Sequence, residues 1–331
     1  MILKKAFAIL LGLSLLLSGC TQEAEGLKKV KVSEVTRSVF YAPSYVALSE
    51  GFFEEEGLDI ELTTGQGADK VMTSVLSGEA DIGFSGPEAV IYVYKEGREN
   101  YPKIFAQVTK RDGSFILGRE KDENFSLDKL KGKKILGGRK GGMPEMTLEY
   151  VLKNNGLTPG KDVEVDTSIQ FALMAGAFSG GEGDYVTLFE PAASLMEREG
   201  KGYVLASVGE KSGEIPYTCY YAGEDYMMEN PEVIERFVRA LGKGQKWLEE
   251  HTPEEVAESI APFFPDADTE LLSEVTKRHK ETDVFTSSPF VREEGFKRLL
   301  EVMKNSGVIE NDVSFGEIVD NSFAVKVKEG K

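Results

Sequence analysis

The chain has 331 residues, a formal net charge of −17 and a hydrophobic content of 41%, which is ordinary for a globular protein. An acidic body repels nucleic acid and anionic lipid headgroups, so neither is an expected partner. The length is enough for two domains, each with a core of its own.

The first twenty residues have the pattern of an export signal. A basic start is followed by an apolar run over residues 6–17, which is too short to span a bilayer as a stable helix. The run ends in Leu-Ser-Gly-Cys20, which resembles the lipobox of bacterial lipoproteins, where the cysteine is lipidated and becomes the new N-terminus. We therefore expect a signal peptide over 1–19 and a lipidated Cys20 with a tether over 20–27. An ordinary secretory signal with a chance cysteine is the alternative, and both place the protein outside the cytoplasm.

Cysteine and histidine usage gives no sign of a disulfide or of metal chemistry. Once Cys20 carries lipid, only Cys219 remains, so no internal disulfide is expected. His251 and His279 lie in a charged C-terminal region without the spacing of metal ligands. We expect no cofactor and no metal.

From residue 29 onward, strand-like and helix-like segments alternate, which predicts an α/β fold. The expected strands are 29–35, 58–62, 80–84, 103–108, 114–117, 134–137, 163–166 and 184–189. The expected helices are 42–50, 69–77, 88–95, 145–154, 170–177 and 192–199. Beyond Asn230 the pattern is mostly helical, with Asn230 as an expected N-cap before a proline and a capping box at Thr252.

A short internal sequence repeat indicates two similar lobes. Residues 77–87 (SGEADIGFSGP) parallel residues 179–191 (SGGEGDYVTLFEP). Each segment has a helix that ends at glycine, an acidic turn, an apolar strand and a proline that opens the next helix.

Five strand-to-helix junctions share a design that predicts a polar cleft. Four have a proline in the first helical turn, and the fifth is Gly65-Gln66-Gly67. Helix N-termini offer free N–H groups, and such junctions lie at the carboxyl ends of strands, where open α/β sheets bind ligands. The prolines are Pro43, Pro87, Pro144 and Pro191. Any one of them alone could be an ordinary helix start.

The remaining motifs leave little room for catalysis. The glycine-rich run 137–144 lacks the ending of a phosphate-binding loop, so we do not expect nucleotide binding. Ser85 is either a helix cap or a ligand hydrogen-bond partner, and no histidine accompanies it. Glu190 either caps a helix or accepts hydrogen bonds from a ligand amino group.

Residues 41–60 (YAPSYVALSEGFFEEEGLDI) resemble the opening of solute-binding proteins of the nitrate, sulfonate, taurine and thiamine-pyrimidine group, the SsuA/THI5-like family. Segments 77–83, 130–135 and 189–191 also match. The resemblance implies a type II periplasmic-binding-protein fold: two α/β lobes joined by two crossover strands, with a ligand cleft between them. The implied lobes are 28–110 with 223–331, and 111–222.

The resemblance also implies the residues that face the solute. A thiamine-pyrimidine ligand would stack on Tyr41 or Phe189 and meet Glu190, which tilts our expectation toward a neutral or amino-bearing heterocycle. A sulfonate or nitrate would instead need helix N-termini with Arg37 or Arg139. The full expected set is Arg37, Ser38, Tyr41, Gly65, Gly67, Ala68, Ser85, Gly86, Pro87, Gly141, Gly142, Met143, Phe189 and Glu190.

The resulting expectation is a monomeric solute receptor without catalysis. It would be lipid-anchored at the outer face of the cell membrane, or periplasmic if the cell has an outer membrane, and would deliver its solute to an ABC permease and ATPase complex. Alternatives are a sulfonate, taurine or nitrate receptor, a sensory module, and a secreted hydrolase if a histidine or a carboxylate pair lies within reach of Ser85. A yeast-type pyrimidine synthase shares the implied fold, but it is cytosolic and has a cysteine-rich motif that this chain lacks.

Overall fold

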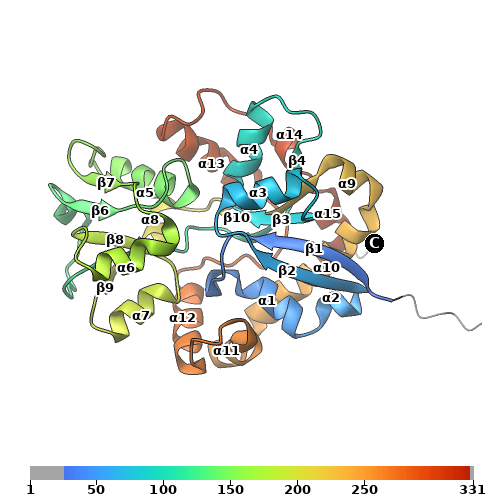
Figure 1. Ribbon diagram of the computed structural model, residues 1–331, viewed down its shortest axis with the longest axis horizontal. Helices are drawn as coiled ribbons and strands as arrows, with labels where there is room; N and C mark the ends of the chain where they lie inside the picture. Colours follow the sequence, from blue (N-terminus) through green and yellow to red (C-terminus); the bar gives the residue numbers. More distant parts are fainter. Residues whose placement is uncertain (1–25, 329–331) are drawn as a thin grey trace, which may run out of the picture.

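The computed structural model describes residues 26–328, so the expected signal peptide and Cys20 lie outside the described part. Two five-stranded sheets form two lobes side by side (Figure 1). The strand orders are β2-β1-β3-β10-β4 and β7-β6-β8-β5-β9. Within residues 26–328, no helix combines the length and the apolar character that crossing a membrane requires.

The two sheets repeat one pattern of strand directions. In the first, β1 runs parallel to β2 and β3, and β10 runs antiparallel between β3 and β4. In the second, β6 runs parallel to β7 and β8, and β5 runs antiparallel between β8 and β9. The first sheet comprises β1 (Lys28–Glu34), β2 (Leu58–Thr64), β3 (Ile82–Ser85), β4 (Pro102–Thr109) and β10 (Thr218–Gly223). The second comprises β5 (Phe115–Gly118), β6 (Lys134–Leu136), β7 (Glu164–Asp166), β8 (Tyr185–Leu188) and β9 (Tyr203–Ser207).

The chain crosses between the lobes twice. It leaves the first sheet after β4 through residues 110–114, and it returns through α8 (Val208–Ser212) and residues 213–217 to β10. The antiparallel strand of each sheet is thus the one that arrives from the other lobe. Because β10 pairs Cys219 with both Ser85 and Gln107, residues 218–222 belong to the first sheet, and the expected boundary at 222 lies too far along the chain.

Helices cover both sheets and continue in a C-terminal group. Those among the strands are α1 (Ala42–Ser49), α2 (Phe52–Glu55), α3 (Ala68–Leu76), α4 (Glu88–Lys95), α5 (Met143–Asn154), α6 (Met174–Ser179) and α7 (Ala192–Arg198). The C-terminal group is α9 (Glu224–Glu229), α10 (Pro231–Glu250), α11 (Pro253–Ile260), α12 (Thr269–Glu281), α13 (Glu293–Asn305), α14 (Phe315–Ile318) and α15 (Ser322–Lys328).

The two expected start signals in the C-terminal group have different outcomes. The capping box at Thr252 is confirmed by reciprocal hydrogen bonds with Glu255. Asn230 is the N-cap residue of α10, with a proline at the helix start as expected, but its side chain makes no capping hydrogen bond and its amide donates to the Tyr226 carbonyl of the preceding helix instead.

Helix α10 fixes the position of α1, whose N-terminus lies at the cleft. Its apolar side chains recur every three or four residues and are buried, among them Ile234, Phe237 and Leu241. Where α10 crosses α1, an ideal Cβ on Gly244 would lie 2.5 Å from the Pro43 carbonyl oxygen. Only glycine allows so close a crossing.

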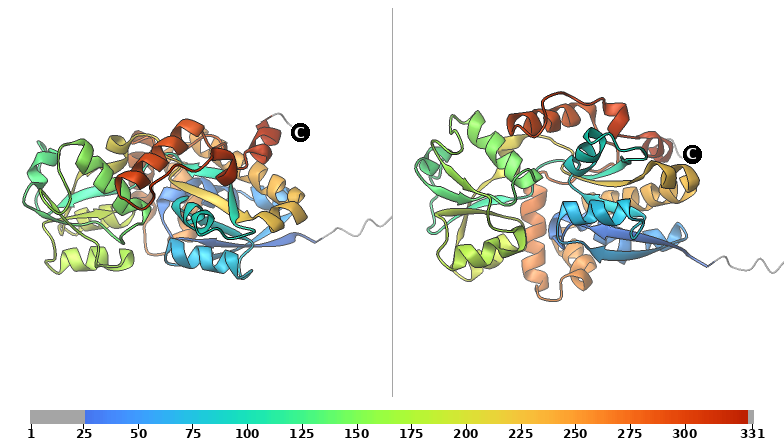
Figure 2. Two further views of the ribbon diagram at one scale, coloured as in Figure 1. Left: turned by 90° about the horizontal axis from the view of Figure 1, so that it is seen from above. Right: turned by 45° about the horizontal axis from the view of Figure 1, so that its top comes forward.

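The lobes touch around the cleft. Helix α12 stands between them (Figure 2), and its Arg278 pairs with Glu190 at 2.7 Å and Glu197 at 2.8 Å in the second lobe. Elsewhere, the Tyr92 hydroxyl donates to the Gly141 carbonyl at 2.7 Å. Contacts from several elements therefore hold the two lobes against each other.

Candidate ligand-binding site

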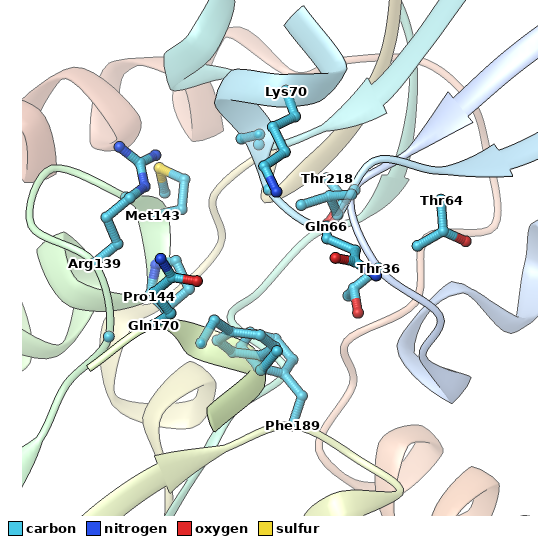
Figure 3. Close-up of a pocket in the computed structure, with 18 of the residues that line it drawn as sticks. Thr36, Thr64, Gln66, Lys70, Arg139, Met143, Pro144, Gln170, Phe189 and Thr218 are labelled. Atoms are coloured by element: carbon cyan, nitrogen blue, oxygen red, sulfur yellow. The ribbon is translucent and has the colours of Figure 1, made fainter. Parts of the chain in front are cut away.

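A pocket of about 400 Å³ lies between the lobes, at the carboxyl ends of strands from both sheets. Helix starts and strand-to-helix loops form its walls, as the junction design predicts. Figure 3 shows the two sides of the pocket. The first lobe contributes Thr36, Thr64, Gln66, Lys70 and Thr218, and the second contributes Arg139, Met143, Pro144, Gln170 and Phe189.

Aromatic side chains form much of the apolar wall. Tyr41, Phe171, Phe189 and Tyr217 all line the pocket. The rings of Phe171 and Phe189 meet edge to face with centroids 5.5 Å apart, and the rings of Phe189 and Tyr217 lie 6.2 Å apart. Such a wall is suited to the flat face of an aromatic or heterocyclic ligand.

The pocket also contains a buried carboxyl group, that of Glu88 at the start of α4. Its residue is only 2% exposed, and among the described residues its Oε2 atom has no hydrogen-bond partner. Burial raises the pKa of Glu88 to about 7, against the opposing effects of its own backbone N–H, of Arg139 and of the Met143 backbone N–H. A buried acceptor without a partner is costly, and such groups are concentrated at functional sites.

Gly86 makes room for this carboxyl group. An ideal Cβ at position 86 would lie 2.0 Å from Glu88 Oε2. Any larger residue would therefore displace the Glu88 side chain from its place over the turn between β3 and α4.

Three cations line the pocket, but they are not equally available. Arg37 Nε lies 3.1 Å from Glu34 Oε1, and its guanidinium carbon stands 5.2 Å from the centre of the Tyr45 ring. Lys70 and Arg139 approach the pocket from opposite lobes, and both are exposed (Figure 3). In the described residues, no group of three or more His, Cys, Asp and Glu side chains could hold a metal ion.

The structure brings part of the expected site together. The expected residues that line the pocket are Arg37, Tyr41, Gly67, Ala68, Gly86, Gly142, Met143 and Phe189. The expected residues outside its lining are Ser38, Gly65, Ser85, Pro87, Gly141 and Glu190.

Glu190 serves as a cap and an ion-pair partner. Its carboxylate accepts hydrogen bonds from the backbone N–H and the hydroxyl of Ser194 in α7, both at 2.9 Å, and pairs with Arg278. Burial raises the pKa of Glu190, while Arg278 and Ser194 act to lower it. Of the two expected roles, the capping role is thus the one that its contacts fit, because these partners occupy both carboxylate oxygens.

Of the two expected roles of Ser85, the capping role is wrong, and Ser85 lies outside the pocket lining. Its hydroxyl lies 2.8 Å from the Tyr221 hydroxyl and 3.3 Å from the Gly86 carbonyl oxygen, and it caps no helix. Ser38, in turn, donates to the Glu190 carbonyl at 2.6 Å and so links the two lobes beside the pocket. The hydrolase alternative requires a histidine or a carboxylate pair within hydrogen-bond reach of Ser85. In the described residues, the hydrogen-bond partners of the Ser85 hydroxyl are instead Tyr221 and Gly86.

Several residues that line the pocket were not predicted from the sequence. Glu88 follows Pro87 and reads as an ordinary acidic residue in a first helical turn, where the helix dipole favours it. Thr218 begins β10 and Tyr217 directly precedes it, and the sequence pattern did not predict this strand. Phe171 was not among the expected site residues, and the signal that it lines a site is its place in a short turn after β7.

Two α/β lobes joined by two crossings around a pocket define the type II periplasmic-binding-protein fold. Residues 39–256, about two thirds of the chain, match the family described as NMT1/THI5 like. The chain belongs to this family.

Individual relatives include binding proteins and an enzyme. Over 315 residues the chain is 43% identical to "Putative binding protein YtlA" of Bacillus subtilis, covering 95% of this chain and 94% of that one. It is 23% identical to 4-amino-5-hydroxymethyl-2-methylpyrimidine phosphate synthase of Candida albicans, covering 72% of each chain. In structure, the alkanesulfonate-binding protein SsuA from Xanthomonas axonopodis, bound to MOPS, matches with a TM-score of 0.72 at 16% identity, covering 90% of this chain and 99% of that one. The structural match concerns the fold, and the stronger of the two sequence matches is to a binding protein.

Proposed function

We propose that this chain is the solute receptor of an ABC importer: its lobes close over a small organic solute and present it to a permease. The observation that carries the proposal is a pocket of about 400 Å³ with walls from both lobes. This volume suits a small molecule, and an apolar wall with a few polar groups is typical of small-molecule sites. The likeness to a binding protein over 95% of the chain supports it.

The favoured solute is a heterocycle that is neutral or carries an amino group. The aromatic wall supports a flat ring, and the Glu88 carboxyl supports a ligand that donates an N–H group. The thiamine-pyrimidine type meets both demands. Identity with a pyrimidine phosphate synthase at 23% is compatible with this class of solute.

A sulfonate, taurine or nitrate is the second candidate. Lys70 and Arg139 line the pocket, and α3 and α5 begin at it with Gly67 and Gly142 as their N-cap residues. Free N–H groups and positive charge are what an oxyanion requires. Against this candidate, an oxyanion would share the pocket with the Glu88 carboxyl.

The receptor would act at the outer face of the membrane, held there by lipid on Cys20. The export signal and the Leu-Ser-Gly-Cys sequence support this placement. A tether concentrates the receptor near its permease. Replacing Cys20 with serine should move the protein from the membrane fraction to the soluble extracytoplasmic fraction, and an unchanged membrane fraction would contradict the anchor.

A thermal-shift screen of the protein without its lipid tests the receptor function. The panel holds thiamine precursors, riboflavin, taurine, alkanesulfonates and nitrate. A ligand at 100 times its Kd should stabilise the fold by about 2.7 kcal/mol. The proposal fails if no member stabilises the protein, or if the protein converts a member chemically.

Two neighbouring substitutions show whether binding occurs in the pocket. Ala172 is exposed and lines the pocket, so Ala172→Trp should fill the cavity and abolish the thermal shift. Leu173 is 62% exposed and lies outside the lining, so Leu173→Trp is the matched control. Equal effects of the two variants would place the ligand elsewhere.

A further inference from the structure

We propose that Glu88 is the specificity-determining residue of the pocket, and that it selects solutes carrying an N–H donor, such as an ammonium or an amino group on a nitrogen heterocycle. This inference rests on the proposed receptor function. It deepens that function by naming the group that distinguishes one solute class from the other.

The first observation is that one oxygen of the Glu88 carboxyl group, Oε2, has no hydrogen-bond partner among the described residues. Glu88 lines the pocket and is only 2% exposed. Water and the protein's own donors are the usual partners of a buried carboxyl oxygen. A ligand in the pocket can supply the missing donor.

The second observation is that the fold preserves this arrangement. Gly86 leaves the space that Oε2 occupies, since an ideal Cβ there would lie 2.0 Å away. Glu88 also stands at the start of α4, so its side chain is anchored on a regular element rather than on a loop.

The third observation concerns the charges around the carboxyl group. Arg139 faces it from the second lobe, and the hydroxyl-bearing Tyr41, Tyr92, Tyr217 and Tyr221 and the thiol of Cys219 surround it in the first lobe. Arg139 is exposed, so Glu88 is not held in a tight ion pair of the kind that Arg278 forms with Glu190.

These surroundings suit an amino heterocycle in both protonation states. An ionised carboxylate accepts hydrogen bonds from an ammonium or amino group. A protonated carboxyl donates to a ring nitrogen while its second oxygen accepts from the neighbouring amino group. An oxyanion such as a sulfonate offers no donor and is repelled by the ionised form.

The test pairs changes in the solute with changes in the protein, at pH 7.5, by calorimetry. The probes are 4-amino-5-hydroxymethyl-2-methylpyrimidine and its analogue without the 4-amino group, and taurine and ethanesulfonate, which differ chiefly by the ammonium. The variant is Glu88→Gln, which keeps the size of the side chain. The control is Glu145→Gln, because Glu145 is also buried, also has a pKa raised to about 7, and lies outside the pocket lining.

We expect at least one nitrogen probe to bind wild type at least about tenfold more tightly than its partner without the amino group, the effect of one hydrogen bond to a charged group. In Glu88→Gln this ratio should fall below about twofold, whereas Glu145→Gln should keep it. If Glu88→Gln folds poorly, Gly86→Ala provides the second route, because displacing the carboxyl group should reduce the same ratio.

Three results overturn the inference. The first is that Glu88→Gln leaves the affinity ratio between a nitrogen probe and its partner unchanged. The second is that ethanesulfonate binds as tightly as taurine and that the amino group of the pyrimidine has no effect on affinity. The third is that neither nitrogen probe binds. Binding of a sulfonate that Ala172→Trp blocks would overturn this inference and leave the receptor function intact. The inference and the receptor function fail together if no member of the thermal-shift panel binds.

Discussion

Each lobe carries one buried glutamate just after a central strand of its sheet, and the two have opposite surroundings. Glu88 follows β3 and comes directly after the segment 77–87, whereas Glu190 follows β8 and lies within the similar segment 179–191. Ser194 and Arg278 satisfy the carboxylate of Glu190, whereas Oε2 of Glu88 has no partner among the described residues. Within residues 26–328, a buried glutamate after the central strand thus has partners for both carboxylate oxygens in one lobe and an oxygen without a partner in the other.

The largest expected effect concerns the Glu190 side of this comparison. Arg278→Met would leave the Glu190 carboxylate buried without its cation, and we expect a loss of about 3–5 kcal/mol in the free energy of unfolding. Urea denaturation measures it. The double variant with Glu190→Gln should recover much of the loss, and a loss below about 1 kcal/mol would show that the pair does not stabilise the fold.

The next effect is a pH dependence that belongs to Glu88. Its pKa rises from 4.5 in a model peptide to about 7 in the folded protein, so between these values the folded state binds more protons than the unfolded state. The free energy of unfolding of the ligand-free protein should therefore fall as pH rises from about 4.5 to about 7, by about 3 kcal/mol for this group.

The difference between wild type and Glu88→Gln, measured by urea denaturation from pH 4 to pH 8, isolates that contribution. Asp112, with a pKa near 6, and Glu145 also titrate in this window, and both remain in the variant. Parallel curves for the two proteins would show that Glu88 is not perturbed in the fold.

A smaller effect is expected for Ser194, whose hydroxyl donates to Glu190 and accepts a hydrogen bond from Arg278 at 3.1 Å. Ser194→Ala removes the hydroxyl that donates at 2.9 Å and should lower the free energy of unfolding by about 1.5 kcal/mol. Calorimetry should show ligand affinity unchanged within about twofold, because Glu190 does not line the pocket. A large change in affinity would mean that the Glu190 side also acts on the ligand.

The smallest effect concerns Phe171, on the ligand side. Phe171→Ala removes a half-buried ring from the pocket wall and should weaken binding of a ring-shaped solute by about 1 kcal/mol, roughly fivefold in Kd. Stability should change little. Leu173→Ala is the control. Equal affinities of the two variants would show that the Phe171 ring does not contribute to binding.

The sequence was sufficient for the architecture because its signals are local. Alternating segments predicted most strands, and the repeat between 77–87 and 179–191 indicated the two lobes. Prolines marked the helix starts at the cleft. The strands β9 and β10 were not predicted, because neither alternates buried and exposed side chains along its length.

The site was harder because it depends on which side chains find partners in space. Glu190 stands beside a proline at a junction and was expected to face the ligand, but Arg278, distant in the sequence, occupies its carboxylate. Glu88 was overlooked because an acidic residue in a first helical turn is ordinary. The space that Gly86 leaves for it became visible only in three dimensions.

A crystal structure of the protein with the tightest-binding probe of the panel tests the central claim most directly. We predict the solute between the lobes, with its ring against Phe171 and Phe189 and a nitrogen within about 3 Å of Glu88 Oε2. An oxyanion at the starts of α3 and α5 with no contact to Glu88, or a solute bound outside the pocket, would contradict it.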